Sequence, residues 1–456
     1  MFSPDHQLED LIFEYCRTRL RDPVPLDHPG EKENLERALD GLLNEEGTDA
    51  ARVLAIFAEH LATAVISCDS PRFLSFIPAA PTKASLLFDM VVSASSLQAT
   101  SWLEAAGPVA AENQALRLLA DLAGLPASAG GCFVSGGSAA NLSALAVARD
   151  VARQRRGAGR AGAARVAVGD QSHSSVARAL HLLGMQPLVV PTAGDRLTGP
   201  ALRAALDDDA DPSSVVATVA TAGTTNAGIV DALDGIGEVC ADHGMWLHVD
   251  GAYGGGALFA PSARYRFAGI EMADSFVIDP HKWLFAPFDC AALLYRHPQL
   301  ARAVHTQDAA YLDVIHTGAP DEWNPSDYAF HLTRRARGLP LWFSLAVHGT
   351  GAYRDAIEAV LSLAGAAADL IESAPHLELV RRPELSVVLF RRPGWAQADY
   401  AAWSARLLAD QVAFVTPTTW EGETVARLAF LHPSTTLDMV VEILASMTGG
   451  SGPARA

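Results

Sequence analysis

Two polar residues follow apolar runs in the middle of the chain and could act together on one ligand. Asp250 closes an apolar run that begins at Met245, and Lys282 comes shortly after the run Ser275–Ile278. Both runs have the length and composition of buried strands. Open α/β sheets bind ligands beyond the carboxyl ends of their strands. A carboxylate and an amine at two such ends can therefore face the same ligand.

A lysine and an acid placed in this way suit pyridoxal phosphate (PLP). The amine forms a Schiff base with the aldehyde of PLP, and the carboxylate keeps the pyridine nitrogen protonated, so that the ring can absorb electrons. The spacing alone also fits an ordinary surface lysine and a strand-end Asp that caps a helix, because short motifs have high false-positive rates.

The residues around the pair resemble those of a known enzyme family. HVDGAY (His248–Tyr253) followed by DPHKW (Asp279–Trp283) is similar to the group II PLP-dependent amino-acid decarboxylases. This family includes the aromatic-amino-acid, glutamate, histidine and diaminobutyrate decarboxylases. The resemblance covers roughly residues 69–427, and several separate motifs fall in the family's order. It implies that Lys282 carries PLP and that Asp250 binds the ring nitrogen, both as catalytic residues.

A segment of small residues, Phe133–Asn141, indicates a phosphate site. It has the pattern of a strand, a tight turn and the start of a helix, where backbone N–H groups and the helix dipole favour an anion. An ordinary serine-capped helix fits the same pattern. The resemblance implies that Gly137 and Ser138 contact the cofactor phosphate.

The resemblance also gives roles to four residues around the expected ring. His173 would stack on one face of the ring and help to hold the substrate carboxylate as a catalytic residue, and Ala252 would pack on the other face. Thr225 would lie beside the ring near the acid, and His281, just before the lysine, would contact the cofactor. Taken singly, these residues could also be ordinary cap, packing or turn residues.

Residues near both ends of the resemblance are candidates for substrate binding. Phe76, Ile77 and Pro78 match the family's pocket-lining segment and predict a pocket for an aromatic or aliphatic side chain rather than for glutamate. The same run would make an equally good core segment. Arg427 aligns with an arginine of the family's small domain. Transaminases of the same superfold carry a carboxylate-binding arginine there, so Arg427 does not discriminate between reactions.

Two positions depart from the family pattern. Asp279 stands where many members have Asn, and an ionised carboxylate cannot donate to a phosphate, so we expect it to point elsewhere or to bind through backbone or water. In aromatic-acid decarboxylases a loop tyrosine protonates the carbanion. Counting back from RRARGLPLWF (334–343) puts Pro325 in that place. Tyr328, three residues on, is our candidate for the catalytic acid.

The elements that would position these residues alternate between strand and helix. Helical patterns such as Ala139–Arg153 separate apolar runs, and this alternation indicates a mostly parallel sheet covered on both faces. Seven strands match the large domain of the fold-type I PLP enzymes, the architecture that the resemblance names. The expected strands are Gly131–Ser135, Arg165–Gly169, Gln186–Val190, Val215–Thr221, Met245–Asp250, Ser275–Ile278 and Cys290–Tyr295.

The sequence predicts three domains within an α/β architecture. Residues 1–81 read as a helical arm, which the resemblance implies wraps the other subunit of a homodimer. Residues 82–340 form the expected large PLP-binding domain. Residues 341–456 mix helical stretches with extended runs, which suits a small α+β domain.

Composition narrows the class of protein. Half of the residues are hydrophobic and 19% are charged, which is typical of a globular chain. The net charge of −18 argues against nucleic acid or an anionic membrane as a partner. Five dispersed cysteines without a CxxC pair suit a reduced cytoplasm, and we expect neither disulfides nor a metal site. We find no signal-peptide pattern at the amino terminus and no apolar run long enough to span a bilayer.

We therefore predict a cytoplasmic PLP-dependent carboxy-lyase that converts an L-amino acid to its amine and carbon dioxide. The nearest alternative is an aldehyde synthase, in which the decarboxylated intermediate reacts with oxygen to give aldehyde, ammonia and peroxide. It becomes credible where the loop tyrosine is missing. A more remote alternative is a non-catalytic PLP-binding protein, which the presence of Lys282, Asp250 and His173 disfavours.

Overall fold

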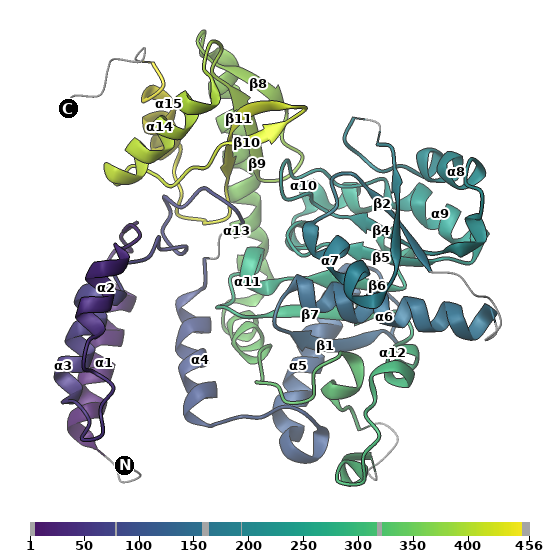
Figure 1. The fold of residues 1–456 in the computed structure, drawn as a ribbon, viewed down its shortest axis with the longest axis horizontal. Helices are drawn as coiled ribbons and strands as arrows, with labels where there is room; N and C mark the ends of the chain where they lie inside the picture. The colour runs from purple at the N-terminus through teal and green to yellow at the C-terminus, as the bar shows by residue number, and fades with distance from the viewer. Residues whose placement is uncertain (1–4, 78–79, 157–163, 193, 317–321, 449–456) are drawn as a thin grey trace. The chain divides into compact units, whose positions relative to one another are not determined.

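The structure is a computed structural model that describes residues 5–77, 80–156, 164–192, 194–316 and 322–448 (Figure 1). The chain divides into two units. The smaller unit comprises Met1–Pro78, Ala366–Arg381 and Leu389–Ala456, and the larger one comprises Ala79–Gly365 and Arg382–Val388. The three domains expected from the sequence stay a prediction.

The larger unit is built on a seven-stranded sheet in the order β1-β7-β6-β5-β4-β2-β3. The strands from β3 to β6 are parallel, whereas β7 runs antiparallel to both of its neighbours, β1 and β6. This arrangement confirms the predicted mostly parallel sheet. The strands are β1 (Gly130–Val134), β2 (Arg165–Gly169), β3 (Gln186–Val190), β4 (Val215–Thr221), β5 (Trp246–Asp250), β6 (Ser275–Ile278) and β7 (Ala291–Tyr295).

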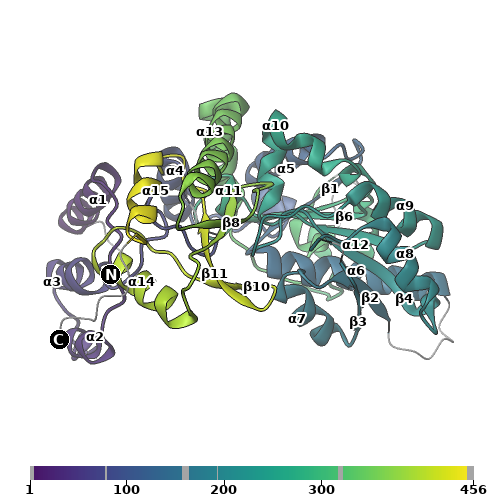
Figure 2. The ribbon, with the colours of Figure 1, turned by 90° about the horizontal axis from the view of Figure 1, so that it is seen from above.

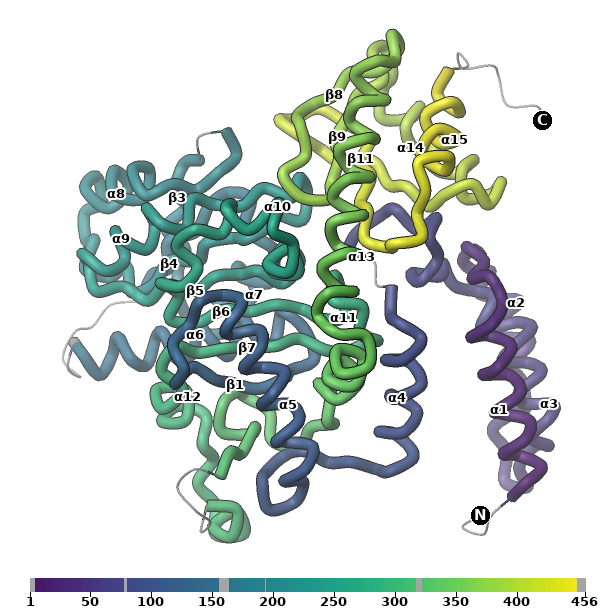
Figure 3. Tube along the Cα trace, turned by 180° about the vertical axis from the view of Figure 1, so that it is seen from behind, coloured from purple at the N-terminus to yellow at the C-terminus, as the bar shows by residue number. Residues whose placement is uncertain are grey.

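Helices cover both faces of this sheet. Figure 2 shows α6 and α7 on one side and α5 on the other, and Figure 3 shows α5 crossing β1. A covered sheet explains why β4 to β7 are mostly apolar and are buried along their whole length. The helices are α4 (Lys83–Ala94), α5 (Trp102–Leu122), α6 (Gly137–Arg156), α7 (Ser174–Leu183), α8 (Gly199–Asp207), α9 (Leu233–His243), α10 (Pro261–Arg264), α11 (Pro280–Trp283) and α12 (Pro298–His305).

The smaller unit contains the amino-terminal helices and most of a second sheet. Helices α1 (His6–Arg21), α2 (Lys32–Leu39) and α3 (Ala50–Ile56) lie side by side (Figure 1). The second sheet has the order β10-β11-β9-β8. Its strands are β8 (Glu378–Arg381), β9 (Val387–Arg391), β10 (Thr418–Trp420) and β11 (Glu423–Ala429), with helices α14 (Gln397–Ala409) and α15 (Leu437–Ala445). Helix α13 (Leu339–Ser373) contributes residues to both units.

The fold therefore has the α/β and α+β parts expected of a fold-type I PLP enzyme. The mostly parallel sheet carries crossover helices, and the smaller sheet is accompanied by helices of its own. Among the residues that the structure describes, no helix combines the length and the apolar character needed to cross a bilayer.

Candidate active site

A cavity of about 560 Å³ opens at the carboxyl edge of the larger sheet. Residues from the ends of β4, β5 and β6 line it together with the amino end of α6, which is the position expected for a ligand of an open parallel sheet. A volume of this size suits a small organic ligand. The lining residues include Ser138, His173, Thr225, Asp250, Asp279 and Lys282.

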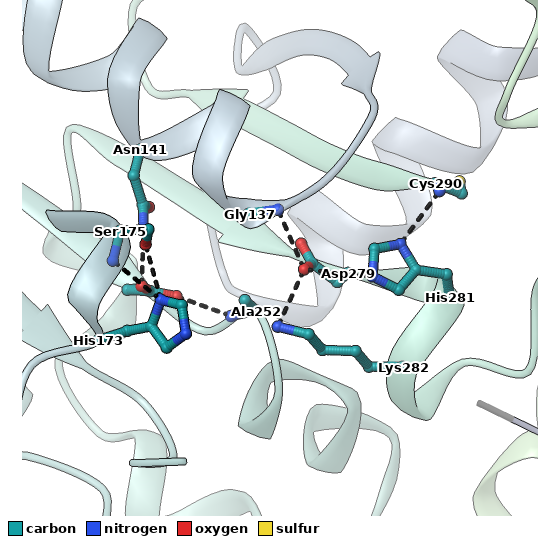
Figure 4. Close-up of polar contacts among 10 residues, drawn as sticks. Gly137, Asn141, His173, Ser175, Ala252, Asp279, His281, Lys282 and Cys290 are labelled. Atoms are coloured by element: carbon teal, nitrogen blue, oxygen red, sulfur yellow. Dashed lines mark hydrogen bonds and ion pairs between the residues drawn. The ribbon is translucent and has the colours of Figure 1, made fainter. Parts of the chain in front are cut away.

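The short helix α11 presents Lys282 to the cavity, where its amine meets Asp279. The Lys282 Nζ lies 3.1 Å from the Asp279 Oδ2, and the backbone N–H of Gly137 donates to the same oxygen at 3.1 Å (Figure 4). The Asp279 side chain is 1% exposed. Its other oxygen, Oδ1, has no hydrogen-bond partner within the described ranges. Asp279 therefore holds a negative charge between the start of α6 and the lysine.

His281 packs beside this pair as a neutral imidazole. Its Nδ1 accepts the backbone N–H of Cys290 at 3.1 Å, so its ring proton lies on Nε2, 3.7 Å from the Asp279 Oδ2. Burial lowers the pKa of His281, although the charge of Asp279 acts in the opposite direction. His281 therefore adds no positive charge beside the ion pair of Lys282 and Asp279.

The second acid, Asp250, ends β5 and is almost fully buried. Its Oδ1 accepts the backbone N–H of Ala252 at 3.1 Å, and its Oδ2 accepts from the Asn141 amide at 2.9 Å. The same amide nitrogen lies 2.9 Å from the Ser175 hydroxyl, which lies 2.8 Å from the His173 Nδ1 (Figure 4). One network therefore holds both the acid and the histidine that the sequence predicts around a ring.

This network continues into the core of the sheet. The His248 Nε2 lies 2.9 Å from the Asn141 Oδ1, and its Nδ1 lies 2.8 Å from the Ser275 Oγ. The Trp246 indole donates to the same hydroxyl at 2.8 Å. Complete burial lowers the pKa of His248 from 6.5 to about 4, so its ring is neutral at physiological pH.

Two glycines allow backbone to approach closely around the cavity. A Cβ on Gly137 would lie 3.1 Å from both the Ala252 Cβ and the Asp279 Oδ2. Gly223 has φ of +109°, and a Cβ there would lie 2.8 Å from the Gly254 Cα. The wall of the cavity therefore depends on the absence of side chains at these two places.

The structure gathers all the residues that the sequence predicts as cofactor contacts. They come from five separate segments of the chain and line this one cavity. They are Gly137, Ser138, His173, Thr225, Asp250, Ala252, His281 and Lys282.

Tyr328, the predicted proton donor, does not line this cavity, and its role as the acid stays a prediction. Its ring is buried in the apolar cluster beneath α6 and stacks on Trp323, with centroids 4.1 Å apart and planes at 11°. Burial raises the pKa of its phenol. In this chain Tyr328 therefore packs as a core residue against Trp323.

The predicted substrate residues belong to the smaller unit. The Arg427 Nη2 donates to the carbonyl of Phe76 at 2.8 Å, and the Phe76 side chain is 62% exposed beside the rings of Phe73 and Phe414. Ile77 is half-buried, and Pro78 lies outside the described residues. Their roles in substrate binding stay predictions.

Sequence reasoning missed Asn141, His248 and Ser175 as members of the site. Asn141 and His248 each lie in a motif that we read for its other residues. The hydrogen bond between them joins positions that are 107 residues apart. A usable signal exists, since Trp246, His248 and Asp250 alternate along one strand and must therefore share a face.

Residues 32–392 match the pyridoxal-dependent decarboxylase conserved domain. The chain belongs to the pyridoxal-dependent decarboxylase family. This confirms the predicted family, the PLP cofactor and the activity class, a PLP-dependent carboxy-lyase.

Known relatives support this assignment over nearly the whole length of the chain. The chain is 31% identical to an aromatic-L-amino-acid decarboxylase of Bacillus atrophaeus, over 96% of this chain and 93% of the relative. It is 33% identical to an L-2,4-diaminobutyrate decarboxylase of Rhizobium meliloti, over 88% of this chain and 82% of that one. A crystal structure of Oryza sativa TDC with PLP and tryptamine has a TM-score of 0.87 at 25% identity, covering 97% of this chain and 96% of that chain.

The cavity of the decarboxylase fits PLP. Lys282 offers an amine for the aldehyde, and the buried carboxylate of Asp250 suits a protonated ring nitrogen. The amino end of α6, with Gly137 and the exposed hydroxyl-bearing Ser138, suits the phosphate. A side chain at position 137 would fill the space beside Ala252, which the glycine leaves open.

The neutral, buried His248 predicts an acid-sensitive stability. Its pKa in the folded state is below that in the unfolded chain, so the unfolded state binds more protons below pH 6.5. The stability that it contributes is complete above pH 6.5 and is lost as the pH falls toward 4. Relative to the His248→Gln variant, the parent should lose about 2 kcal/mol of unfolding free energy between pH 7.5 and pH 5.

Urea unfolding of both proteins at several pH values measures this difference. His348→Gln, at an exposed histidine, serves as the matched control and should follow the parent. Parallel pH profiles for the parent and His248→Gln would contradict the expectation.

Proposed function

We propose that the enzyme decarboxylates an L-amino acid with an aromatic or other apolar side chain, with Lys282 and Asp250 as its central catalytic residues. The observation that carries this proposal is that the Lys282 amine and the Asp250 carboxylate line one cavity at the carboxyl edge of the sheet. An amine and a buried acid in one cavity are the two groups that PLP chemistry requires.

When bound, PLP supplies an aldehyde that takes up the substrate amine and a ring that withdraws electrons from the bond to the carboxylate. Lys282 would hold the cofactor and give way to the substrate amine. Asp250, kept in place by donors on both carboxylate oxygens, would hold a proton at the ring nitrogen. His173 would cover the ring and hold the substrate carboxylate, and Ser138 and Gly137 would bind the phosphate.

The substrate class is proposed from the apolar segment and from a relative. Phe76 is 62% exposed, and its ring packs beside the buried ring of Phe73 and the half-buried ring of Phe414. The Bacillus atrophaeus relative, which aligns with nearly the whole chain, is an aromatic-L-amino-acid decarboxylase. The similarity to a diaminobutyrate decarboxylase makes a cationic side chain the alternative to be tested.

An assay of carbon dioxide release over a panel of amino acids tests the proposal. We expect turnover with an aromatic or aliphatic L-amino acid, and lower rates with glutamate and 2,4-diaminobutyrate. Lys282→Ala should lower the rate by about 100- to 10,000-fold, as expected for a residue that takes part in bond making. Borohydride reduction and peptide mapping should find the pyridoxyl group on Lys282.

A second lysine serves as the control, and the site of labelling and the identity of the products can each contradict the proposal. Lys83→Ala, at an exposed lysine of α4, should leave the rate unchanged. A pyridoxyl label on another lysine would refute the role of Lys282. Because Tyr328 lies in the core, the assay also follows oxygen and peroxide. If aldehyde and peroxide are the main products, the enzyme is an aldehyde synthase rather than an amine-forming decarboxylase.

The proposal includes a homodimer in the cytoplasm. The described residues of α1, α2 and α3 include no buried side chain, and Leu8, Ile12 and Phe13 are exposed. Covering such side chains with a second copy would remove apolar area from water. The cytoplasmic location rests on the dispersed cysteines of the sequence.

Light scattering on the purified enzyme checks the assembly. We expect a mass of about twice that of the 48.2 kDa chain, and a monomer for the double variant Ile12→Asp, Phe13→Asp, since burying two carboxylates is costly. A dimer that survives both changes would exclude this arm from the interface.

Asp279 makes a prediction about cofactor affinity. Its charge lies at the start of α6, where we place the phosphate, so it should oppose phosphate binding. Asp279→Asn retains an oxygen for the Gly137 N–H but removes the charge, and it should tighten PLP binding by about tenfold. Titration of cofactor-free protein with PLP, followed by intrinsic fluorescence, measures the dissociation constant.

Asp289→Asn is the matched control, because Asp289 lines the same cavity but is 44% exposed and paired with Arg337. It should change the affinity much less, since water screens its charge. Weaker binding by Asp279→Asn would instead mean that Asp279 acts mainly by holding Lys282 ready for the aldehyde.

A further inference from the structure

The hydrogen bonds between the core of the sheet and the cavity allow one pattern of donors and acceptors. An ionised carboxylate only accepts, so Asn141 must turn its amide nitrogen toward Asp250. Its carbonyl oxygen then faces the His248 Nε2 at 2.9 Å and can only accept. The ring proton of His248 therefore lies on Nε2, and its Nδ1 accepts from the Ser275 hydroxyl at 2.8 Å.

The Trp246 end of this series of hydrogen bonds fixes the direction in which each hydrogen is donated. The Trp246 indole can only donate, and it donates to the Ser275 Oγ, which leaves the hydroxyl hydrogen for His248. His248 and Ser275 are fully buried and Asn141 nearly so. A reversed link would set a donor against a donor among buried side chains, which is costly. The orientation of the Asn141 amide is therefore set from inside the sheet.

A second branch runs from the same amide to His173. The Asn141 nitrogen also donates to the Ser175 Oγ at 2.9 Å, so the Ser175 hydroxyl must give its hydrogen to the His173 Nδ1 at 2.8 Å. The backbone N–H of Ser175 points at the same ring nitrogen, at 3.2 Å. Neutral His173 therefore carries its proton on Nε2, the nitrogen left for the cavity that it lines (Figure 4).

We propose that Asn141 is a positioning residue that presents Asp250 as an acceptor and His173 as an Nε2–H donor, and that His248 prevents the Asn141 amide from flipping. The inference rests on the proposed function, in which these two groups meet the ring and the substrate carboxylate. A single amide then sets the hydrogen-bonding state of both groups. Its loss would free Asp250 from one donor and let His173 adopt either tautomer.

Four variants separate positioning from folding. Asn141→Leu removes both amide hydrogens at nearly constant volume, and His248→Leu removes the group that orients the amide. His248→Gln restores a donor that can reach the Asn141 oxygen. Ser143→Ala is the matched control, because Ser143 is a buried polar residue of the same helix whose hydroxyl bonds the Ala139 carbonyl.

Two spectroscopic readouts do not depend on turnover. The ¹⁵N shifts of His173 in ¹⁵N-histidine-labelled protein, assigned by their loss in His173→Gln, report its tautomer. The ¹⁵N shift of ring-labelled PLP in the holoenzyme reports protonation of the ring nitrogen. In the parent and in Ser143→Ala we expect a proton on the His173 Nε2 and a protonated ring nitrogen.

Asn141→Leu should give mixed tautomers of His173, a ring nitrogen shifted toward its unprotonated value, and a kcat lowered about 10- to 100-fold, as for loss of a charge-assisted hydrogen bond. KM should change little. His248→Leu should move the same signals part of the way, and His248→Gln should restore most of them.

Parent-like spectra in Asn141→Leu would overturn the proposal even if kcat falls, because the role would then be structural. If that variant does not fold, equal spectra in His248→Leu and His248→Gln would overturn it. Asp250→Asn distinguishes failure of the proposed function from failure of the positioning role. If the ring nitrogen signal does not change in this variant, the proposed role of Asp250 is refuted rather than that of Asn141.

Discussion

The parallel pairing of β4, β5 and β6 is the constraint on which the site depends. Thr221 pairs with Asp250 and Asp250 with Val277, so the three strands end in register at one edge of the sheet. Groups that lie far apart in the sequence must meet wherever neighbouring strands end together. The crossover geometry also brings the amino end of α6 to this edge. The chemistry of the decarboxylase therefore follows from strand direction first and from individual side chains second.

Burial determines the charges that this edge carries. The pKa values of His248 and His281 are lowered, so neither imidazole adds positive charge at neutral pH. The carboxylate of Asp250 is stabilised by an amide and a backbone N–H, and that of Asp279 by a backbone N–H and Lys282. The donors to Asp250 carry no net charge and leave its charge available to a ligand, whereas Lys282 pairs with the charge of Asp279.

The sequence was informative where the physics is local. Apolar runs bounded by turn residues located the strands of the large sheet, and the resemblance to the decarboxylase family assigned the cofactor residues that follow them. Counting along a loop could not foresee the stacking on Trp323 that buries Tyr328. Asn141 and His248 were missed because the hydrogen bond between them joins a helix to a strand that is distant in the sequence and comes close only in the folded chain.

The side chains of β5 alternate, with Trp246, His248 and Asp250 on the face toward Asn141 and Leu247 and Val249 on the other. Inserting or deleting one residue inside the strand would reverse the facing of the residues beyond that point, so the indole, the imidazole and the acid could no longer share one face. Substitutions can therefore accumulate in this strand one at a time, whereas changes in its length cannot. Natural or laboratory divergence of the enzyme should place its length variation in the surface connections, and the parity of β5 should stay unchanged.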